Sequence, residues 1–184
     1  MKLIVAITGA SGSIYAKDLI ERLIVAEQQI TSLAIISSQN AKWIWEHELS
    51  EAWPTHKKIT YYENNNFMAP FASGSSKWDA MAIVPASMGS IGRIANGTSD
   101  DLISRSADVM LKEERKLIIC PRETPLNQIH LKNLLQLQKA GGTILPTNPS
   151  FYSKPKTIKE LVGSVSSRII DHLGIRQEEA YRWS

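Results

Sequence analysis

The chain has 184 residues, of which 43% are hydrophobic and 21% charged, a balance that favours one globular domain spanning residues 1–184. The formal net charge is only +3 and the basic residues are scattered, so we expect no nucleic-acid partner. A single cysteine, Cys120, excludes a disulfide framework and a cysteine-based zinc site. No apolar run is long enough for a membrane span, and we predict a cytoplasmic protein.

Apolar runs alternate with stretches of helical spacing along the chain. The first run, Lys2 to Thr8, leads through a turn rich in glycine and serine into apolar positions that recur every fourth residue. Further strand-like runs follow at Ile30 to Ile36, Ala80 to Val84, Lys116 to Cys120 and Gly142 to Leu145. This alternation predicts an α/β fold with five strands in a parallel sheet, buried on both faces.

Two other segments stand apart from this alternation. A last helix is predicted over Ile158 to Ile169, with Thr157 as its cap and Gly174 as its stop. Residues 53–78 contain two prolines, three consecutive asparagines and a Ser-Gly-Ser-Ser run. We expect a functional loop or an oligomer contact there, because structureless loops longer than about 15 residues are otherwise uncommon.

Two loops rich in glycine and hydroxyl groups follow predicted strands. The Thr8 to Ser13 loop opens a helix, where backbone N–H groups can meet an anion, although an ordinary turn explains this loop equally well. It has neither the full GxGxxG fingerprint nor the lysine of a P-loop. The second loop is Pro85 to Arg93. Together with Ser37 or Ser38 after the second strand, the loops predict a phosphate-bearing ring cofactor across the carboxyl edge of the sheet.

Charged residues flank the fourth predicted strand. Arg105, Asp108 and Lys112 share one stripe of a predicted helix, which a ladder of surface ion pairs also explains. Arg122 and Glu123 end the apolar strand itself, where an anionic ligand would lie, so a functional role is the better interpretation for them.

Two further residues have a structural and a functional interpretation each. Tyr152 follows the fifth predicted strand, where it either contacts a ligand or plugs the end of the sheet. Arg168 borders the apolar stripe of the last helix, as a snorkelling side chain would. The four histidines show no metal-ligand spacing, and we expect no metal site.

Several long blocks of the sequence resemble the UbiX family of flavin prenyltransferases. They are TGASGSIY at 8–15, SGSS at 73–76, PASMGSIGRIANGTSDDLISRSADVMLKEERK at 85–116, PRETPLNQIHLKN at 121–133 and ILPTNPSFYSKP at 144–155. The resemblance extends to Arg182 and Trp183. It implies a three-layer, Rossmann-like sheet of the flavodoxin type with helices on both faces, which binds FMN and dimethylallyl phosphate.

The resemblance also implies a reaction and an assembly. The prenyl group would pass to N5 and C6 of reduced FMN without a metal ion, phosphate would leave, and the prenylated FMN would serve a UbiD-like decarboxylase. A homo-oligomer, possibly a dodecamer with sites between subunits, is implied as well. Two alternatives stay open: an FMN-dependent decarboxylase of aromatic or peptidyl acids, and a non-catalytic flavin carrier. The chain lacks the PxMNxxMW signature of the related cysteine decarboxylases.

Site residues follow from the same resemblance. The residues matched to FMN contacts are Gly9, Ala10, Ser11, Ser38, Ser87, Met88, Gly89, Ser90 and Arg122. The residues matched to prenyl-phosphate and other substrate positions are Arg105, Lys112, Arg122, Tyr152 and Arg168. The residues matched to catalytic positions are Ser11, Glu48, Lys112 and Glu123. Ser38 is preferred to Ser37 because its register also brings Glu48 onto the family's glutamate.

Two chemical roles remain open among these expectations. Either Glu123 or the released phosphate would take the proton that leaves flavin C6. Trp183 or the aromatic residues near 67–71 would shield an allylic cation from water.

Overall fold

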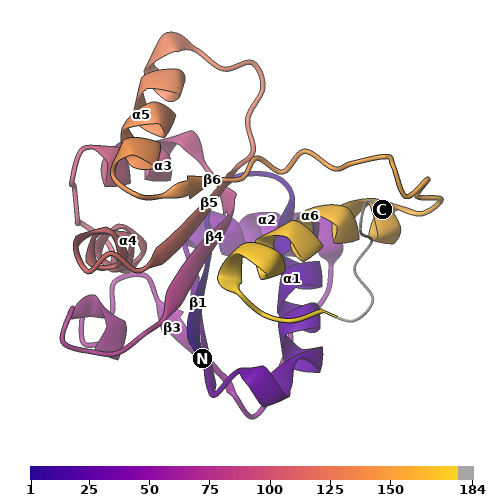
Figure 1. Cartoon of the computed structure of the whole chain (residues 1–184), viewed down its shortest axis with the longest axis horizontal. Helices are drawn as coiled ribbons and strands as arrows, with labels where there is room; N and C mark the ends of the chain where they lie inside the picture. Colours follow the sequence, from indigo (N-terminus) through magenta and orange to yellow (C-terminus); the bar gives the residue numbers. More distant parts are fainter. Residues whose placement is uncertain (178–184) are drawn as a thin grey trace.

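Six parallel strands form one sheet in the computed structural model, which describes residues 1–177 (Figure 1). The strands are β1 (Lys2–Ile7), β2 (Ser32–Ser37), β3 (Ile59–Glu63), β4 (Ala80–Ala86), β5 (Lys116–Pro121) and β6 (Thr143–Ile144). Their order across the sheet is β3-β2-β1-β4-β5-β6. From β1 the chain adds β2 and β3 on one side of the sheet. It then returns to the other side of β1, where it adds β4, β5 and β6. The helices that follow β1 and β4 cover opposite faces of the sheet at this point, where ligands bind in open α/β sheets.

Helices cover both faces of the sheet (Figure 1). They are α1 (Ser13–Val25), α2 (Gln39–Leu49), α3 (Met88–Ala95), α4 (Leu102–Lys112), α5 (Gln128–Lys139) and α6 (Ile158–Leu173), with short 3-10 turns η1 (Glu27–Gln29) and η2 (Pro70–Ala72). Alternate residues of β1 point to opposite faces: Leu3 and Val5 pack with α1, α2 and α6, whereas Ile4 and Ala6 pack with α3, α4 and α5. The predicted three-layer α/β fold is confirmed.

Helix ends follow the capping residues that the sequence supplies. Thr157 caps α6, because its hydroxyl oxygen accepts a hydrogen bond from the Glu160 amide at 3.1 Å. Gly174 ends the same helix in the left-handed conformation, with φ of 86°. Both predictions for the last helix are confirmed. No helix within residues 1–177 is long and apolar enough to cross a membrane.

The strand count predicted from the sequence was wrong by one. Ile59–Glu63 forms β3 inside the segment 53–78, for which we expected a loop. Its sequence, ITYYE, is short and lies among polar residues, and it pairs only with β2 at the edge of the sheet. The same segment supplies the fully buried Phe71, which packs edge-on against Tyr62 and Trp78 at ring-centroid distances of 5.0 Å.

Backbone contacts hold the rest of this segment along α4. The Asn64 carbonyl accepts from the Leu102 amide at 2.7 Å, and the Arg105 Nε donates to the Ala72 carbonyl at 2.9 Å. Beyond the end of α4, Arg115 donates to the Gly74 carbonyl at 2.8 Å and to the Ser76 carbonyl at 2.7 Å. The segment is thus structured within one chain. An additional role in oligomer contacts stays a prediction.

Candidate functional site

The loops that follow β1 and β4 are joined by the buried hydroxyl of Thr8. Thr8 Oγ1 donates to the Pro85 carbonyl at 2.8 Å and accepts from the Ser87 amide at 2.7 Å, and the side chain is 1% exposed. The Thr8 amide donates to the same Pro85 carbonyl at 3.3 Å. The two loops that the sequence singled out for phosphate and flavin therefore lie side by side at the carboxyl edge of the sheet.

The first loop passes close to α2. A Cβ at Gly9 would lie 2.7 Å from the Cβ of Asn40, so only glycine fits there without movement of α2. Ala10 is buried, whereas Ser11 is exposed. The next glycine, Gly12, has φ of 111°, a conformation that side chains disfavour. The glycines therefore shape the turn and leave Ser11 at the surface.

Glu48, on α2, binds the amino-terminal turn of α1. Its carboxylate accepts hydrogen bonds from the Gly12 amide at 3.0 Å and the Ser13 amide at 2.8 Å, and it also bonds the Ser11 hydroxyl. Partial burial acts to raise the pKa of Glu48, but these hydrogen bonds together outweigh it, and the pKa lies below its ordinary value. The anion at these amides is thus a side chain of the protein itself. A ligand phosphate would need other donors.

The second loop begins α3. Ser87 caps the helix, with its Oγ accepting from the Ser90 amide at 3.5 Å, and Met88 and Ser90 are buried. Gly89 is exposed, and a Cβ there would lie 3.9 Å from Arg93 Nη1, an ordinary van der Waals distance. The helix start therefore combines hydroxyl groups with an exposed glycine whose position would accept a Cβ without a clash.

Ser38 follows β2 at the same edge of the sheet. Its amide donates to the Ile7 carbonyl at 3.0 Å, and its Oγ caps α2 by accepting from the Ala41 amide at 3.1 Å. Ser37, the alternative, belongs to β2 and is only 7% exposed. The hydroxyl beyond the strand end is that of Ser38.

Arg122 and Glu123 lie directly beyond β5. The Arg122 amide donates to the Ala86 carbonyl at 3.3 Å, which ties it to the end of β4. Burial raises the pKa of Tyr15 on α1, and the positive charge of Arg122 opposes this rise. Glu123 is exposed, and its carboxylate accepts from the Thr124 amide at 3.0 Å. Both side chains stand at the carboxyl edge.

Tyr152 and Arg168 come from the segment after β6. Tyr152 lies in the loop that precedes α6 and is 70% exposed. Arg168 lies on α6, where its Nη1 is 3.3 Å from a carboxylate oxygen of Asp171. Both side chains are therefore exposed at the surface rather than built into the core.

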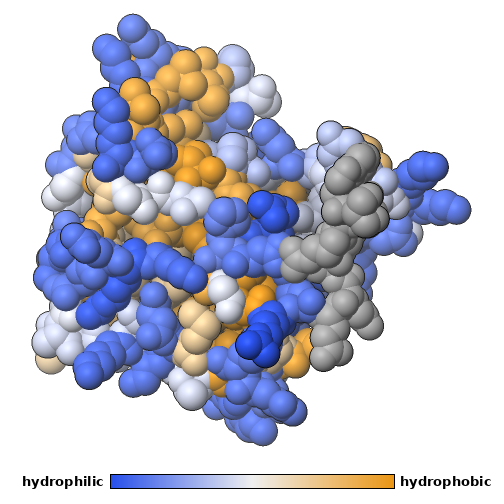
Figure 2. Space-filling view, viewed as in Figure 1, coloured by the Kyte–Doolittle hydropathy of each residue, from blue (hydrophilic) through white to orange (hydrophobic). Residues whose placement is uncertain are grey.

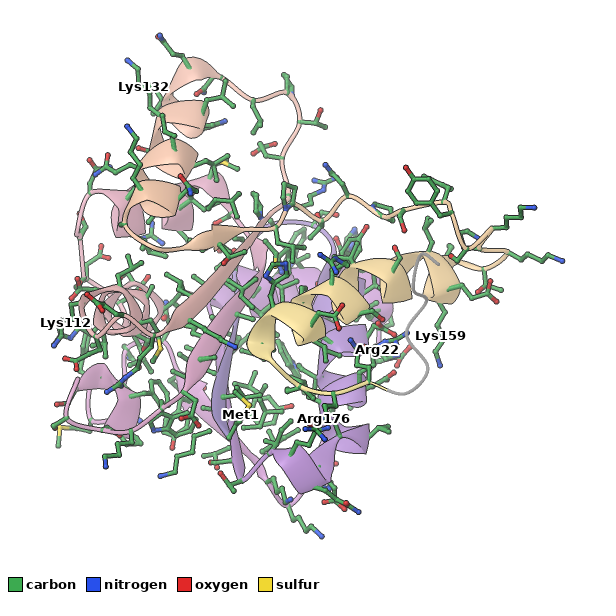
Figure 3. All side chains as sticks on the ribbon, viewed as in Figure 1. Met1, Arg22, Lys112, Lys132, Lys159 and Arg176 are labelled. Carbon is green, nitrogen blue, oxygen red and sulfur yellow. The ribbon has the colours of Figure 1, made fainter. Side chains whose placement is uncertain are left out.

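Lys112 lies at the opposite edge of the sheet from the loops that follow β1 and β4. It is the last residue of α4, shortly before β5 begins at Lys116, and Figure 3 shows it pointing outward from that end. The six residues of β5 span about 20 Å between this edge and Arg122. Lys112 Nζ donates to Glu113 at 2.6 Å, and this hydrogen bond and charge lower the pKa of Glu113. Within one chain, Lys112 does not meet the other site residues.

Arg105 is held on the outer side of α4. Its Nη1 pairs with Asp108 at 3.0 Å while its Nε binds the Ala72 carbonyl. The ion-pair ladder that we considered as an alternative interpretation is thus present for Arg105 and Asp108.

The residues expected to shield an allylic cation have different surroundings. Phe71 is fully buried in the core, so this aromatic side chain is not available to a ligand at the surface. Phe67 is 46% exposed. Trp183, with Arg182, lies outside the described residues.

Sequence reasoning missed the residue that joins the two loops. Thr8 is part of the TGASGSIY block, but we did not assign it to the site. A polar residue that ends an otherwise apolar strand was the signal that it has buried hydrogen-bond partners. Among residues 1–177, no group of three or more His, Cys, Asp or Glu side chains is arranged to hold a metal ion.

Comparison with known proteins identifies the family. A model of the Flavoprotein family matches residues 1–170. The flavin prenyltransferase UbiX of Methanocaldococcus jannaschii is 48% identical over 185 residues, a match that covers 100% of this chain and 98% of that protein. The chain belongs to the UbiX family of flavin prenyltransferases. The resemblance inferred from the sequence blocks is confirmed.

Crystal structures place the fold within the UbiX family as well. AnUbiX (PadA1) in complex with FMN and dimethylallyl pyrophosphate has a TM-score of 0.90 and 34% identity, covering 100% of this chain and 97% of that one. The dodecameric FMN-dependent UbiX-like decarboxylase of Escherichia coli O157:H7 also has a TM-score of 0.90 and 34% identity, with 100% of both chains covered. The flavodoxin-type fold is therefore that of the UbiX family.

Glu48→Gln tests the link between Glu48 and the first loop. Because the folded-state pKa of Glu48 is lowered, its ionised form stabilises the protein above the ordinary value of 4.5. We expect the substitution to cost about 1 kcal/mol at neutral pH, a value reduced for the partial exposure of the carboxylate. The difference in free energy of unfolding from wild type should be constant above about pH 5 and shrink as the pH falls through the folded-state pKa.

Denaturant unfolding between pH 3 and pH 8 measures this difference. Glu46→Gln, which removes an exposed carboxylate from the same helix, is the matched control and should show no such pH dependence. A Glu48→Gln difference that does not change with pH would contradict the assigned hydrogen bonds.

Proposed function

We propose that this chain is a metal-independent flavin prenyltransferase. It joins a dimethylallyl group from dimethylallyl phosphate to N5 and C6 of reduced FMN, releases phosphate and supplies prenylated FMN to a UbiD-like decarboxylase. The observation that carries the proposal is the match along the whole chain to a flavin prenyltransferase at 48% identity. The FMN and dimethylallyl pyrophosphate bound by AnUbiX support the choice of both substrates.

The carboxyl edge of the sheet suits a phosphorylated ring. The joined loops supply hydroxyl groups at Ser11, Ser38 and Ser87, and the exposed Gly89 leaves the backbone at the start of α3 accessible. Arg122 adds a cation that suits phosphate or a flavin carbonyl oxygen. We assign FMN binding to Gly9, Ala10, Ser11, Ser38, Ser87, Met88, Gly89, Ser90 and Arg122. FMN bound there would supply the nucleophilic N5 and C6 atoms of the reduced ring.

The prenyl phosphate requires cations, because negative charge grows on the phosphate as the allylic C–O bond breaks. Donors fixed in place before the reaction stabilise this charge most effectively. Arg122, Lys112 and Arg168 would provide the cations, with Arg105 nearby, and Tyr152 would donate from its hydroxyl. Arg168 and Tyr152 are exposed and can meet a ligand without opening the core.

Lys112 would reach this phosphate from a second copy of the chain. Its position at the amino edge of the sheet, about 20 Å along β5 from Arg122, rules out a contact within one chain. The dodecameric structure of the related E. coli protein supports an assembly that brings copies together. Helix α5 carries three exposed apolar side chains, Ile129, Leu131 and Leu135. Apolar surface lies over this helix in Figure 2, and a neighbouring copy would cover it.

Two carboxylates would have separate roles in this scheme. Glu48 would hold Ser11 and the first loop in place, since its oxygens are bonded to that loop. Glu123 is exposed beside Arg122 and would accept the proton that leaves flavin C6. Its hydrogen bond from the Thr124 amide leaves the second carboxylate oxygen for this task.

Anaerobic incubation with reduced FMN tests the proposed function. We expect mass spectrometry to detect a flavin that has gained the dimethylallyl group when the purified protein is given dimethylallyl monophosphate or diphosphate. Comparing the two donors also shows which one the protein uses. Unmodified flavin with both donors would contradict the proposal. Carbon dioxide released from an aromatic acid by the protein alone would instead support the direct decarboxylase.

Co-expression of two inactive variants tests the shared site. Lys112→Ala and Arg122→Ala should each lower the prenylation rate by about 100-fold or more, because each removes a cation from the departing phosphate. If random mixing joins Arg122 of one chain to Lys112 of another, about one quarter of the sites are intact, and the mixed oligomer should recover a similar share of wild-type activity.

A second mixture of two variants controls for activity that returns without a site shared between copies. Lys112→Ala mixed with Arg105→Ala should not recover, because both residues lie on α4 and one chain supplies both to a given site. Failure of the Lys112→Ala and Arg122→Ala mixture to recover would contradict a site shared between copies.

A further inference from the structure

Arg93 connects the start of α3 with the start of α4. It lies in the last turn of α3, and its Nη2 donates to Ser90 Oγ at 3.2 Å and to a carboxylate oxygen of Asp101 at 3.4 Å. Its Nε lies 3.5 Å from a carboxylate oxygen of Asp100. Its Nη1 lies 3.9 Å from where a Cβ of Gly89 would be, so the guanidinium lies beside the second loop. We did not single out Arg93 from the sequence.

Arg93 determines how the Ser90 hydroxyl can bond. Ser90 Oγ accepts from the Ser87 hydroxyl at 3.2 Å and from Arg93 Nη2 at 3.2 Å. A hydroxyl oxygen accepts two hydrogen bonds at most, so the Ser90 hydroxyl is left only as a donor. Ser90 is 5% exposed, which makes an unused donor costly unless it finds an acceptor.

The neighbouring Ser87 is left with the opposite role. Its hydroxyl proton is directed at Ser90, and its oxygen accepts from the Ser90 amide at 3.5 Å. One acceptor position therefore remains on Ser87 Oγ. The pair offers one acceptor and one donor side by side. A flavin ring carries the complementary pattern on its pyrimidine edge, where an N–H donor adjoins carbonyl acceptors.

Asp101, the carboxylate partner of Arg93, is held in place by its own hydrogen bonds. Asp101 caps α4, with one carboxylate oxygen accepting from the Ser104 amide at 2.7 Å, while its other oxygen faces Arg93. The capping box holds this carboxylate in place, so the guanidinium has a rigid partner away from the loop.

We propose that Arg93 is a positioning residue for flavin binding, which acts through Ser90 by holding its hydroxyl as a donor toward a carbonyl oxygen of the flavin ring. This inference rests on the proposed binding of FMN at the second loop. It assigns Arg93 no direct part in prenyl transfer. Its effect should therefore depend on the presence of the Ser90 hydroxyl.

A double-mutant cycle tests this dependence. The FMN dissociation constant is measured by flavin fluorescence for wild type, Arg93→Met, Ser90→Ala and the double variant. We expect Arg93→Met to weaken binding about five- to tenfold when Ser90 is present, and by less than about twofold in the Ser90→Ala background. Arg93→Lys, which keeps a cationic donor, should retain most of the affinity.

Arg22→Met is the matched control. Arg22 also joins an aspartate and a serine, with Nε 2.7 Å from Asp18 and Nη1 3.5 Å from Ser167, but it does so between α1 and α6. Its loss should leave FMN affinity within about twofold of wild type. Thermal unfolding of each variant without FMN shows whether it folds, and Arg93→Gln replaces Arg93→Met in the cycle if the latter does not.

The possible results separate this inference from the proposed function. An unchanged affinity in Arg93→Met, or the same loss with and without the Ser90 hydroxyl, would overturn the role of Arg93 while wild type still binds FMN. Failure of wild type to bind FMN would overturn the proposed flavin site itself, and this inference with it.

Discussion

The organisation of the candidate site depends on one buried hydroxyl. Thr8 directly follows β1 at the point where the strand order reverses. Its Oγ1 donates to the Pro85 carbonyl near the end of β4 and accepts from the Ser87 amide just beyond that strand. Parallel pairing of β1 with β4 brings the loops to one edge, but pairing alone does not fix how they lie beyond the strands. The two hydrogen bonds supply that constraint, and the low exposure of Thr8 makes both costly to lose.

The second constraint is the length of the strands. The proposed flavin contacts lie in loops at the carboxyl edge of the sheet. Lys112, at the end of α4, lies at the amino edge, where its side chain packs against the SGSS block at residues 73–76. A Cβ at Gly74 would lie 2.6 Å from Lys112 Nζ and 2.2 Å from Glu113 Oε1, so the glycine permits this approach. Under the proposed function, one chain would therefore present two half-sites at opposite edges. This geometry gives a physical reason for an enzyme of this size to act as an oligomer.

The sequence predicted the fold better than it predicted the site. Uninterrupted apolar runs identify β1, β4 and β5, because strands buried on both faces admit few polar residues. The edge strand β3 was missed, since its short sequence ITYYE shows no apolar run and lies in a polar segment. Periodicity carries no information on which edge of the sheet a helix end reaches, so the separation of Lys112 from Arg122 emerged only from the topology.

Individual side-chain hydrogen bonds could not be predicted from the sequence either. The pairing of Glu48 with the α1 turn joins residues 35 or 36 positions apart, and nothing in the intervening sequence indicates it. The roles of individual site residues, the single-domain organisation and the cytoplasmic location stay predictions.

We propose that the flavin lies across the two loops that Thr8 joins, and the FMN affinity of Thr8 variants tests this placement most directly. Thr8→Ser keeps the hydroxyl, and we predict an FMN dissociation constant within about threefold of wild type. Thr8→Val keeps the shape but leaves the Ser87 amide without its partner, and we predict binding weakened by about tenfold or more in a protein that still folds. Wild-type affinity in Thr8→Val would contradict the account.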